Sequence, residues 1–146
     1  MADVKIVVGL DGSEASGRVI DFATSLAHQI GECEIIACYV IEWSPFAFQS
    51  AEENERRHRR REDEIATARE RVIDPAVAAL TNAGVKVQGK VAHGDVADII
   101  ERLAVKNDAR QIVIGRVGTR GVVQRIFGGV SGRLIVQSPV PVTIVP

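Results

Sequence analysis

The stretch Gln111-Ile-Val-Ile-Gly-Arg-Val-Gly118, followed after nine further residues by Gly128-Gly-Val-Ser131, sets glycines between two different structural patterns. The apolar run at residues 111–114 is typical of a buried strand, and residues 130–137 are typical of the start of a helix. Glycines there let backbone N–H groups approach a phosphate, and a helix N-terminus adds unpaired donors and a partial positive charge. The stretch predicts an anion or nucleotide site; the alternative is a pair of purely structural turns.

Outward from this stretch, strand patterns alternate with helical patterns along the chain. The strand patterns lie at residues 5–10, 33–41, 85–91, 111–114 and 140–145. The helical patterns lie at residues 19–30, 52–83, 95–105 and 130–137. Strands that alternate with helices form a parallel sheet covered on both faces, and right-handed crossovers make it a doubly wound α/β fold. We expect one domain, residues 1–146, whose last strand lies at an edge because prolines flank it.

Helical periodicity also predicts which side chains face the sheet. In the first helix the apolar positions include Val19, Phe22 and Ala23. In the long helix, Pro75 is expected to kink or divide the helix. Its inner face is expected to hold Ile65, Ala68, Val72, Ala76, Ala79 and Leu80.

Composition excludes several kinds of partner. The chain has 146 residues, 46% hydrophobic and 25% charged, with a net charge of −1, which matches an average soluble domain. No stretch reaches the roughly 20 apolar residues that span a bilayer, and we expect no signal peptide. The basic run at residues 56–61 is flanked by acidic residues, which favours ion pairs along an exposed helix. We therefore expect neither nucleic acid nor a membrane as a partner.

Both cysteines fall in one predicted strand. Cys33 and Cys38 would lie roughly 16 Å apart on opposite faces, too far for a disulfide. We therefore expect buried free thiols and a cytoplasmic protein. The histidines His28, His58 and His93 fall in different elements, so the sequence predicts no metal site.

Ligands of a doubly wound sheet bind at the carboxyl ends of its strands, near the point where strand order reverses. Asp11 follows the first strand, where a carboxylate either accepts hydrogen bonds from ribose hydroxyls or caps the next helix. Arg116 and Arg133 either pair with phosphate or form surface ion pairs. The chain has neither a Walker A loop nor a dinucleotide glycine motif. The sequence shows no nucleophile–base arrangement, which argues against a dedicated hydrolase.

Four segments together resemble the universal stress protein family over essentially the whole chain. They are Val7-Val-Gly-Leu-Asp-Gly-Ser13, Val91-Ala-His-Gly-Asp95, Gly115-x2-Gly118-x9-Gly128 and Pro139-Val-Pro-Val-Thr-Ile-Val145. The resemblance implies five parallel strands in the order 3-2-1-4-5. It also implies a homodimer joined through the last strand, residues 140–145.

Members of this family that bind ATP carry Gly-x2-Gly-x9-Gly-[Ser/Thr]. This chain matches the three glycines, whereas Gly129 stands at the hydroxyl position. The resemblance implies ATP, or ADP or AMP, with or without Mg²⁺. Asp11 would hold the ribose and the backbone around Val40 the adenine. The residues implied at the phosphates are Gly115, Arg116, Gly118, Gly128, Gly129, Val130 and Ser131. One charge-assisted hydrogen bond is worth about 1.5–3 kcal/mol, so on the sequence alone Gly129→Ser is expected to tighten ATP binding.

The resemblance implies a regulatory protein of the stress response, not an enzyme, with at most weak ATPase activity. The alternative is a member of the family that binds no nucleotide and acts through protein partners. In that case the aromatic loop containing Trp43, Phe46 and Phe48 is a candidate contact surface.

Overall fold

Five parallel strands form one sheet with the order β3-β2-β1-β4-β5 in the computed structural model, which describes residues 3–42, 51–116 and 129–146. The strands are β1 (Val4–Leu10), β2 (Cys33–Glu42), β3 (Lys86–Gly94), β4 (Gln111–Gly115) and β5 (Val142–Val145). The helices are α1 (Glu14–Ile30), α2 (Ala51–Ala68), α3 (Asp74–Asn82), α4 (Val96–Lys106) and α5 (Val130–Gln137). The predicted fold class and strand order are confirmed.

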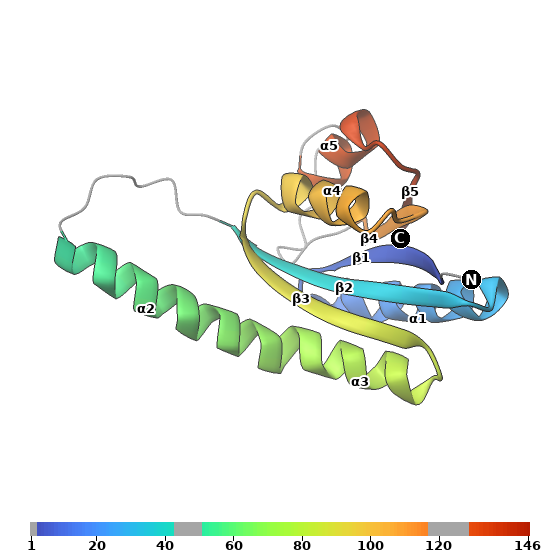
Figure 1. Ribbon diagram of the computed structural model, residues 1–146, viewed down its shortest axis with the longest axis horizontal. Helices are drawn as coiled ribbons and strands as arrows, with labels where there is room; N and C mark the ends of the chain where they lie inside the picture. Colours follow the sequence, from blue (N-terminus) through green and yellow to red (C-terminus); the bar gives the residue numbers. More distant parts are fainter. Residues whose placement is uncertain (1–2, 43–50, 117–128) are drawn as a thin grey trace.

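Helices cover both faces of the sheet, with α1, α2 and α3 on one side and α4 and α5 on the other (Figure 1). Side chains of a strand alternate between the faces, so β1 sends Ile6 and Val8 toward α1 and Val7 toward α4. Burial on both faces explains why the central strands are almost continuously apolar. The helices that follow β1 and β4 in the described chain, α1 and α5, lie on opposite faces of the sheet, and ligands of such folds bind at the carboxyl ends of strands at this reversal point.

The two cysteines lie on opposite faces of β2, as predicted. Cys33 belongs to the apolar cluster under α1 and α3, and Cys38 to the cluster under α4 and α5. Both are buried free thiols. Burial raises the pKa of the Cys38 thiol to about 12, so this thiol is neutral at physiological pH.

A π-helical turn, Arg69–Ile73, joins α2 to α3 and changes the predicted inner face of the long helix. Pro75 lies in the first turn of α3, where its missing N–H leaves no broken hydrogen bond. The π turn adds a residue, and one residue rotates a helix face by about 100°. Ile73, within this turn, is fully buried, whereas Ala79 on α3 is exposed, so its predicted place on the inner face is wrong. Phe22, one of the apolar positions of the first helical pattern, is 40% exposed on α1.

Two strand boundaries differ from the sequence prediction by more than one residue. β3 continues to Gly94, so His93 lies within the strand, where its Nε2 is 3.2 Å from Glu64 Oε2 on α2. β5 begins only at Val142. Val140 lies before the strand, where its N–H donates to the Ser138 hydroxyl and its carbonyl accepts from it. The strand does not extend further back because Pro141 has no N–H to donate to a longer ladder.

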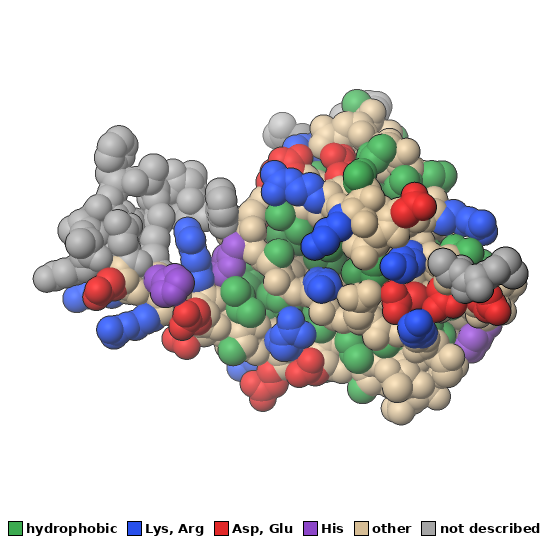
Figure 2. Space-filling model, viewed as in Figure 1, with side chains coloured by type: hydrophobic (Ala, Val, Ile, Leu, Met, Phe, Trp, Pro, Cys, Tyr) green, Lys and Arg blue, Asp and Glu red, His purple; other side chains and the backbone are tan. Residues whose placement is uncertain are grey.

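Charges of both signs are interspersed over the face shown in Figure 2. They extend along the part of α2 that projects beyond the sheet, where His58 and Glu62 pair at 3.1 Å. The described part of the basic run therefore lies on an exposed helix face among acidic residues. Within residues 3–42, 51–116 and 129–146, no helix is long and apolar enough to cross a bilayer.

Candidate functional site

A cavity of about 120 Å³ opens at the carboxyl ends of β1 and β4, where the strand order reverses. It is lined by most of the residues that the sequence singled out. The predicted residues that line it are Asp11, Val40, Gly115, Arg116, Val130 and Ser131. Gly129 lines an adjoining compartment, and Gly118 and Gly128 lie outside the described residues, as do Trp43, Phe46 and Phe48. The structure thus brings together side chains from distant parts of the chain at the predicted edge.

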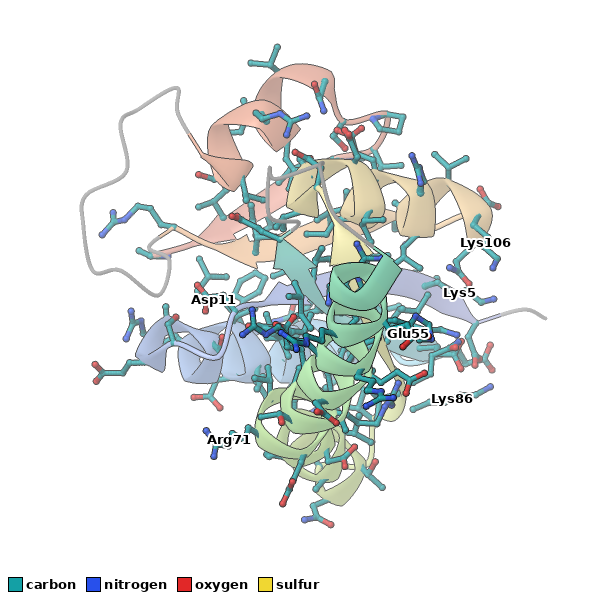
Figure 3. All side chains as sticks on the ribbon, turned by 90° about the vertical axis from the view of Figure 1, so that its left-hand side faces the viewer. Lys5, Asp11, Glu55, Arg71, Lys86 and Lys106 are labelled. Atoms are coloured by element: carbon teal, nitrogen blue, oxygen red, sulfur yellow. The ribbon has the colours of Figure 1, made fainter. Side chains whose placement is uncertain are left out.

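Asp11 lies in the turn between β1 and α1 (Figure 3). Its Oδ1 accepts hydrogen bonds from the Ser13 N–H at 2.9 Å and the Ser16 hydroxyl at 3.1 Å. The Ser16 oxygen in turn accepts the Asp11 N–H at 3.2 Å. Asp11 therefore braces the turn into α1, yet its Oδ2 has no partner among the described residues. The carboxylate can serve the fold with one oxygen and a ligand with the other.

The remaining lining gives the cavity an apolar wall opposite this carboxylate. Cys38, Ile100 and Ile114 form part of this wall. The sequence analysis assigned Cys38 only to the core and did not single out Ser16. The spacing of Ser16 from Asp11 could have indicated their contact, because a residue five positions after the strand end lies in the first turn of the helix, close to the strand end. An apolar wall facing a polar rim suits a flat ring with a polar substituent.

Gly129 precedes α5 with a φ of +88° and a ψ of −174°. This backbone region is essentially restricted to glycine. The Gly129 carbonyl accepts the first helical hydrogen bond, from the Arg133 N–H at 3.2 Å. No side chain caps the helix, so its first N–H groups are available near Ser131. Gly129 departs from the family pattern, but glycine is the residue type that this backbone conformation requires.

The two arginines of the site have different roles. Arg133 bonds both carboxylate oxygens of Asp95 at 2.6 Å and reaches Asp98 at 3.2 Å, which ties α5 to α4. Asp95 caps α4 by accepting the Asp98 N–H, and this hydrogen bond and the Arg133 guanidinium together lower the pKa of the Asp95 carboxyl. The sequence left two roles open for Arg133, a phosphate contact or a surface ion pair, and in the structure it forms the surface ion pair. Arg116 is exposed at the cavity, and its guanidinium has no partner in the described part of the chain.

Within the described ranges, no three side chains of His, Cys, Asp or Glu come together as a metal site. His93, at the strand end, faces Glu64 of α2 and does not line the cavity. The described cavity lining has no histidine beside Ser16 or Ser131 that could serve as a base. The described lining offers hydrogen-bond donors and acceptors around an apolar wall.

A model of the universal stress protein family matches residues 4–146. The chain belongs to the universal stress protein family. It is 31% identical over 142 residues to universal stress protein MJ0531 of Methanocaldococcus jannaschii, which covers 97% of this chain and 81% of that protein. The resemblance drawn from the sequence motifs is thereby confirmed.

Solved structures of universal stress proteins share the fold. UspA from Lactobacillus plantarum matches with a TM-score of 0.83 at 18% identity, covering 100% of this chain and 99% of that chain. A universal stress protein in complex with cAMP matches with a TM-score of 0.66 at 25% identity, covering 99% of this chain and 98% of that chain. The likeness to the first of these establishes the fold alone.

Proposed function

We propose that this universal stress protein binds an adenine nucleotide, foremost ATP, in the cavity between Asp11 and α5. The observation that carries the proposal is the Asp11 carboxylate, fixed through Oδ1 and free at Oδ2 at the reversal point of the sheet. In the proposal this carboxylate accepts hydrogen bonds from the ribose hydroxyls. The base packs on the apolar wall around Val40. The complex of a related universal stress protein with cAMP supports the class of ligand.

The phosphates in this proposal lie at the start of α5. Its uncapped N–H groups and partial positive charge favour an anion, and Ser131 adds a hydroxyl donor. The exposed guanidinium of Arg116 supplies a positive charge at the same mouth. The buried Ser13 Oγ, without a partner in the described part of the chain, marks a further polar group beside Asp11. Any Mg²⁺ would arrive with the nucleotide, bound to its phosphates.

In this proposal the nucleotide is a regulatory ligand, not a substrate for rapid turnover. The support is that the described cavity lining holds no histidine beside Ser16 or Ser131, and that the Asp11 oxygen bonded to Ser16 also braces the turn into α1. Two buried free thiols support a reducing, cytoplasmic setting. Hydrolysis of ATP measured against a no-protein control tests the regulatory assignment, which fast, protein-dependent turnover would overturn.

Calorimetric titration with ATP, ADP, AMP and cAMP, each with and without Mg²⁺, tests the proposed binding directly. We expect saturable binding with an affinity at the micromolar level. Mass analysis of nucleotide released from freshly purified, denatured protein identifies any resident ligand. An absence of heat with all four nucleotides, together with no released nucleotide, contradicts the proposal and favours a protein that acts through partners.

We also propose a homodimer joined through β5. This strand is an edge, so one row of its backbone groups has no partner strand in the described chain, and Ile135 and Val136 are exposed on the neighbouring α5. Sedimentation is expected to give a dimer that Ile144→Pro weakens, because proline removes an N–H from the edge strand. A monomeric parent protein at high micromolar concentration contradicts this proposal.

Gly129→Ser is expected to lower the free energy of unfolding by about 1–3 kcal/mol, because its backbone lies in the glycine-only region. A free Gly129→Ser protein can relax this backbone, so binding ATP must restore a strain similar in size to the roughly 1.5–3 kcal/mol that a new hydroxyl–phosphate bond supplies. We therefore expect no clear gain in ATP affinity, which reverses the expectation from sequence alone. Denaturant unfolding and calorimetry measure the two effects.

The matched control for this substitution is Gly17→Ser on α1, where an added Cβ meets open space. We expect the control to change stability by no more than about 0.5 kcal/mol. A Gly129→Ser protein that is as stable as the parent and binds ATP more than tenfold more tightly would show that this strain is absent.

A further inference from the structure

A second cavity, of about 450 Å³, lies between the carboxyl end of β2 and the helical layer formed by α2 and the π-helical turn. Side chains of a strand alternate between the faces of the sheet, so Val40 lines the cavity proposed for the nucleotide, and its neighbours Tyr39 and Ile41 line the second cavity. The two cavities share no described lining residue, and at the end of β2 they lie on opposite faces of the sheet. The second cavity is therefore a separate candidate site.

The floor of the second cavity is apolar. Tyr39 and Ile41 of β2 and Val72 of the π-helical turn are half-buried, and Ala68 of α2 is buried. Tyr39 and Val72 also pack against the apolar cluster under α1 and α3, so the floor is continuous with the core. A floor that contains an aromatic ring suits the flat, apolar body of an organic ligand.

Two guanidinium groups line the same cavity, from Arg60 of α2 and Arg71 of the π-helical turn. Both side chains are exposed, and neither has a hydrogen bond or an ion pair with a described residue. About three helical turns separate the two arginines, roughly 16 Å along the axis, so they approach the cavity from different ends. The hydroxyls of Tyr39 and Thr67 likewise have no partner in the described part of the chain. The cavity thus combines an apolar floor with hydrogen-bond donors that are free to bond a ligand.

The carboxylates that line the second cavity are not equally available. Glu64 follows Arg60 by four residues, a spacing at which opposite charges on a helix can pair. Glu64 Oε2 instead lies 3.2 Å from His93 Nε2 of β3, which leaves Arg60 without a partner among the described residues. Asp63 is exposed and is the other carboxylate of the lining. Among the unpaired charges, two guanidiniums therefore face one carboxylate, which favours a ligand with a single negative charge over a polyanion.

We propose that the second cavity binds a small organic monocarboxylate with an aromatic body. The ring packs on Tyr39 and Val72, and the carboxylate accepts paired N–H bonds from Arg71, whose planar fork matches the two carboxylate oxygens. Arg60 supplies a second positive charge from the other end. The inference goes beyond the proposed nucleotide binding and does not depend on it, because the two cavities have no described lining residue in common.

Calorimetric titration with phenylbutyrate and with its uncharged amide, phenylbutyramide, tests the proposal. The carboxylate is expected to bind at least about tenfold more tightly than the amide, the size of one charge-assisted hydrogen bond. Arg71→Gln should remove most of this difference by weakening the carboxylate. Asp63→Asn should tighten binding of the carboxylate by roughly two- to fivefold, because it removes one exposed like charge.

The matching phosphonate, phenylpropylphosphonate, tests the class of anion. It carries more negative charge than the carboxylate on the same apolar body, so the repulsion from Asp63 is expected to make it bind more weakly. Tighter binding of the phosphonate than of the carboxylate would overturn the assignment to monocarboxylates.

Arg69→Gln is the matched control, because it makes the same change on an exposed residue of the same π-helical turn outside the cavity. It should keep the parent affinity for phenylbutyrate, and thermal unfolding checks that every variant is folded. Excess ATP should leave this affinity unchanged, whereas displacement by ATP would place the probe in the nucleotide cavity and overturn the proposal. Equal losses from Arg69→Gln and Arg71→Gln, equal affinities for the carboxylate and the amide, or no heat with phenylbutyrate also contradict the proposal. None of these three results bears on the nucleotide site.

Discussion

Gly89→Ala is expected to destabilise the protein by about 1–3 kcal/mol, the usual cost of adding atoms to a well-packed core. A Cβ at this position on β3 would overlap Ile73 Cγ2 and lie 3.2 Å from Val77 Cγ2. Ile73 is fully buried and β-branched, so its methyl group cannot rotate away freely. Gly89 therefore lets the π-helical turn lie close to the sheet. Denaturant unfolding measures the loss.

Two comparisons separate overpacking from a general effect of replacing glycine. In an Ile73→Ala background the overlapping methyl is gone, so adding Gly89→Ala should cost less than about 0.5 kcal/mol. Gly17→Ala on α1 meets no atom within 4 Å and should stabilise the protein by about 0.5–1 kcal/mol. Equal losses from Gly89→Ala in both backgrounds would contradict the packing explanation.

The same π-helical turn shows where sequence periodicity reached its limit. A 3.6-residue repeat correctly predicted the buried positions Ala68, Ala76 and Leu80 of the long helix. It missed Ile73, which lies within the π-helical turn and is fully buried, and it misplaced Ala79, which is exposed on α3 between the buried Ala76 and Leu80. The strand patterns were more robust, since alternation along β1 and β2 depends on neighbours only two residues apart.

Some residues of the candidate site could likewise be placed from the sequence, whereas other features of the site could not. Asp11 and Gly115 could be placed because the carboxyl ends of parallel strands meet at one edge, whatever the side-chain details. The bond between Ser16 and Asp11 depends on side-chain contacts that no periodicity encodes. The φ of Gly129 is likewise invisible in the sequence, where a glycine at a serine position suggests only a lost hydroxyl.

Asp11→Asn is expected to weaken ATP binding by about ten- to a hundredfold while leaving the protein folded. The amide oxygen of asparagine can still accept the Ser13 N–H that the Oδ1 atom now accepts, so the turn into α1 is retained. The negative charge and the second acceptor oxygen are lost, and these are what the ribose hydroxyls would bond. Calorimetry gives the affinity, and thermal unfolding gives the state of the fold.

Two controls make the role of this carboxylate specific. Asp21→Asn is the same chemical change on the exposed surface of α1, and it should leave ATP affinity unchanged. Deoxy forms of ATP lacking the 2′- or 3′-hydroxyl provide the matching change in the ligand. If Asp11 bonds the ribose, the penalty for a missing hydroxyl and the penalty for Asp11→Asn are not additive, because each removes the same contact. Fully additive penalties would instead mean that Asp11 acts on binding only through the turn that it braces.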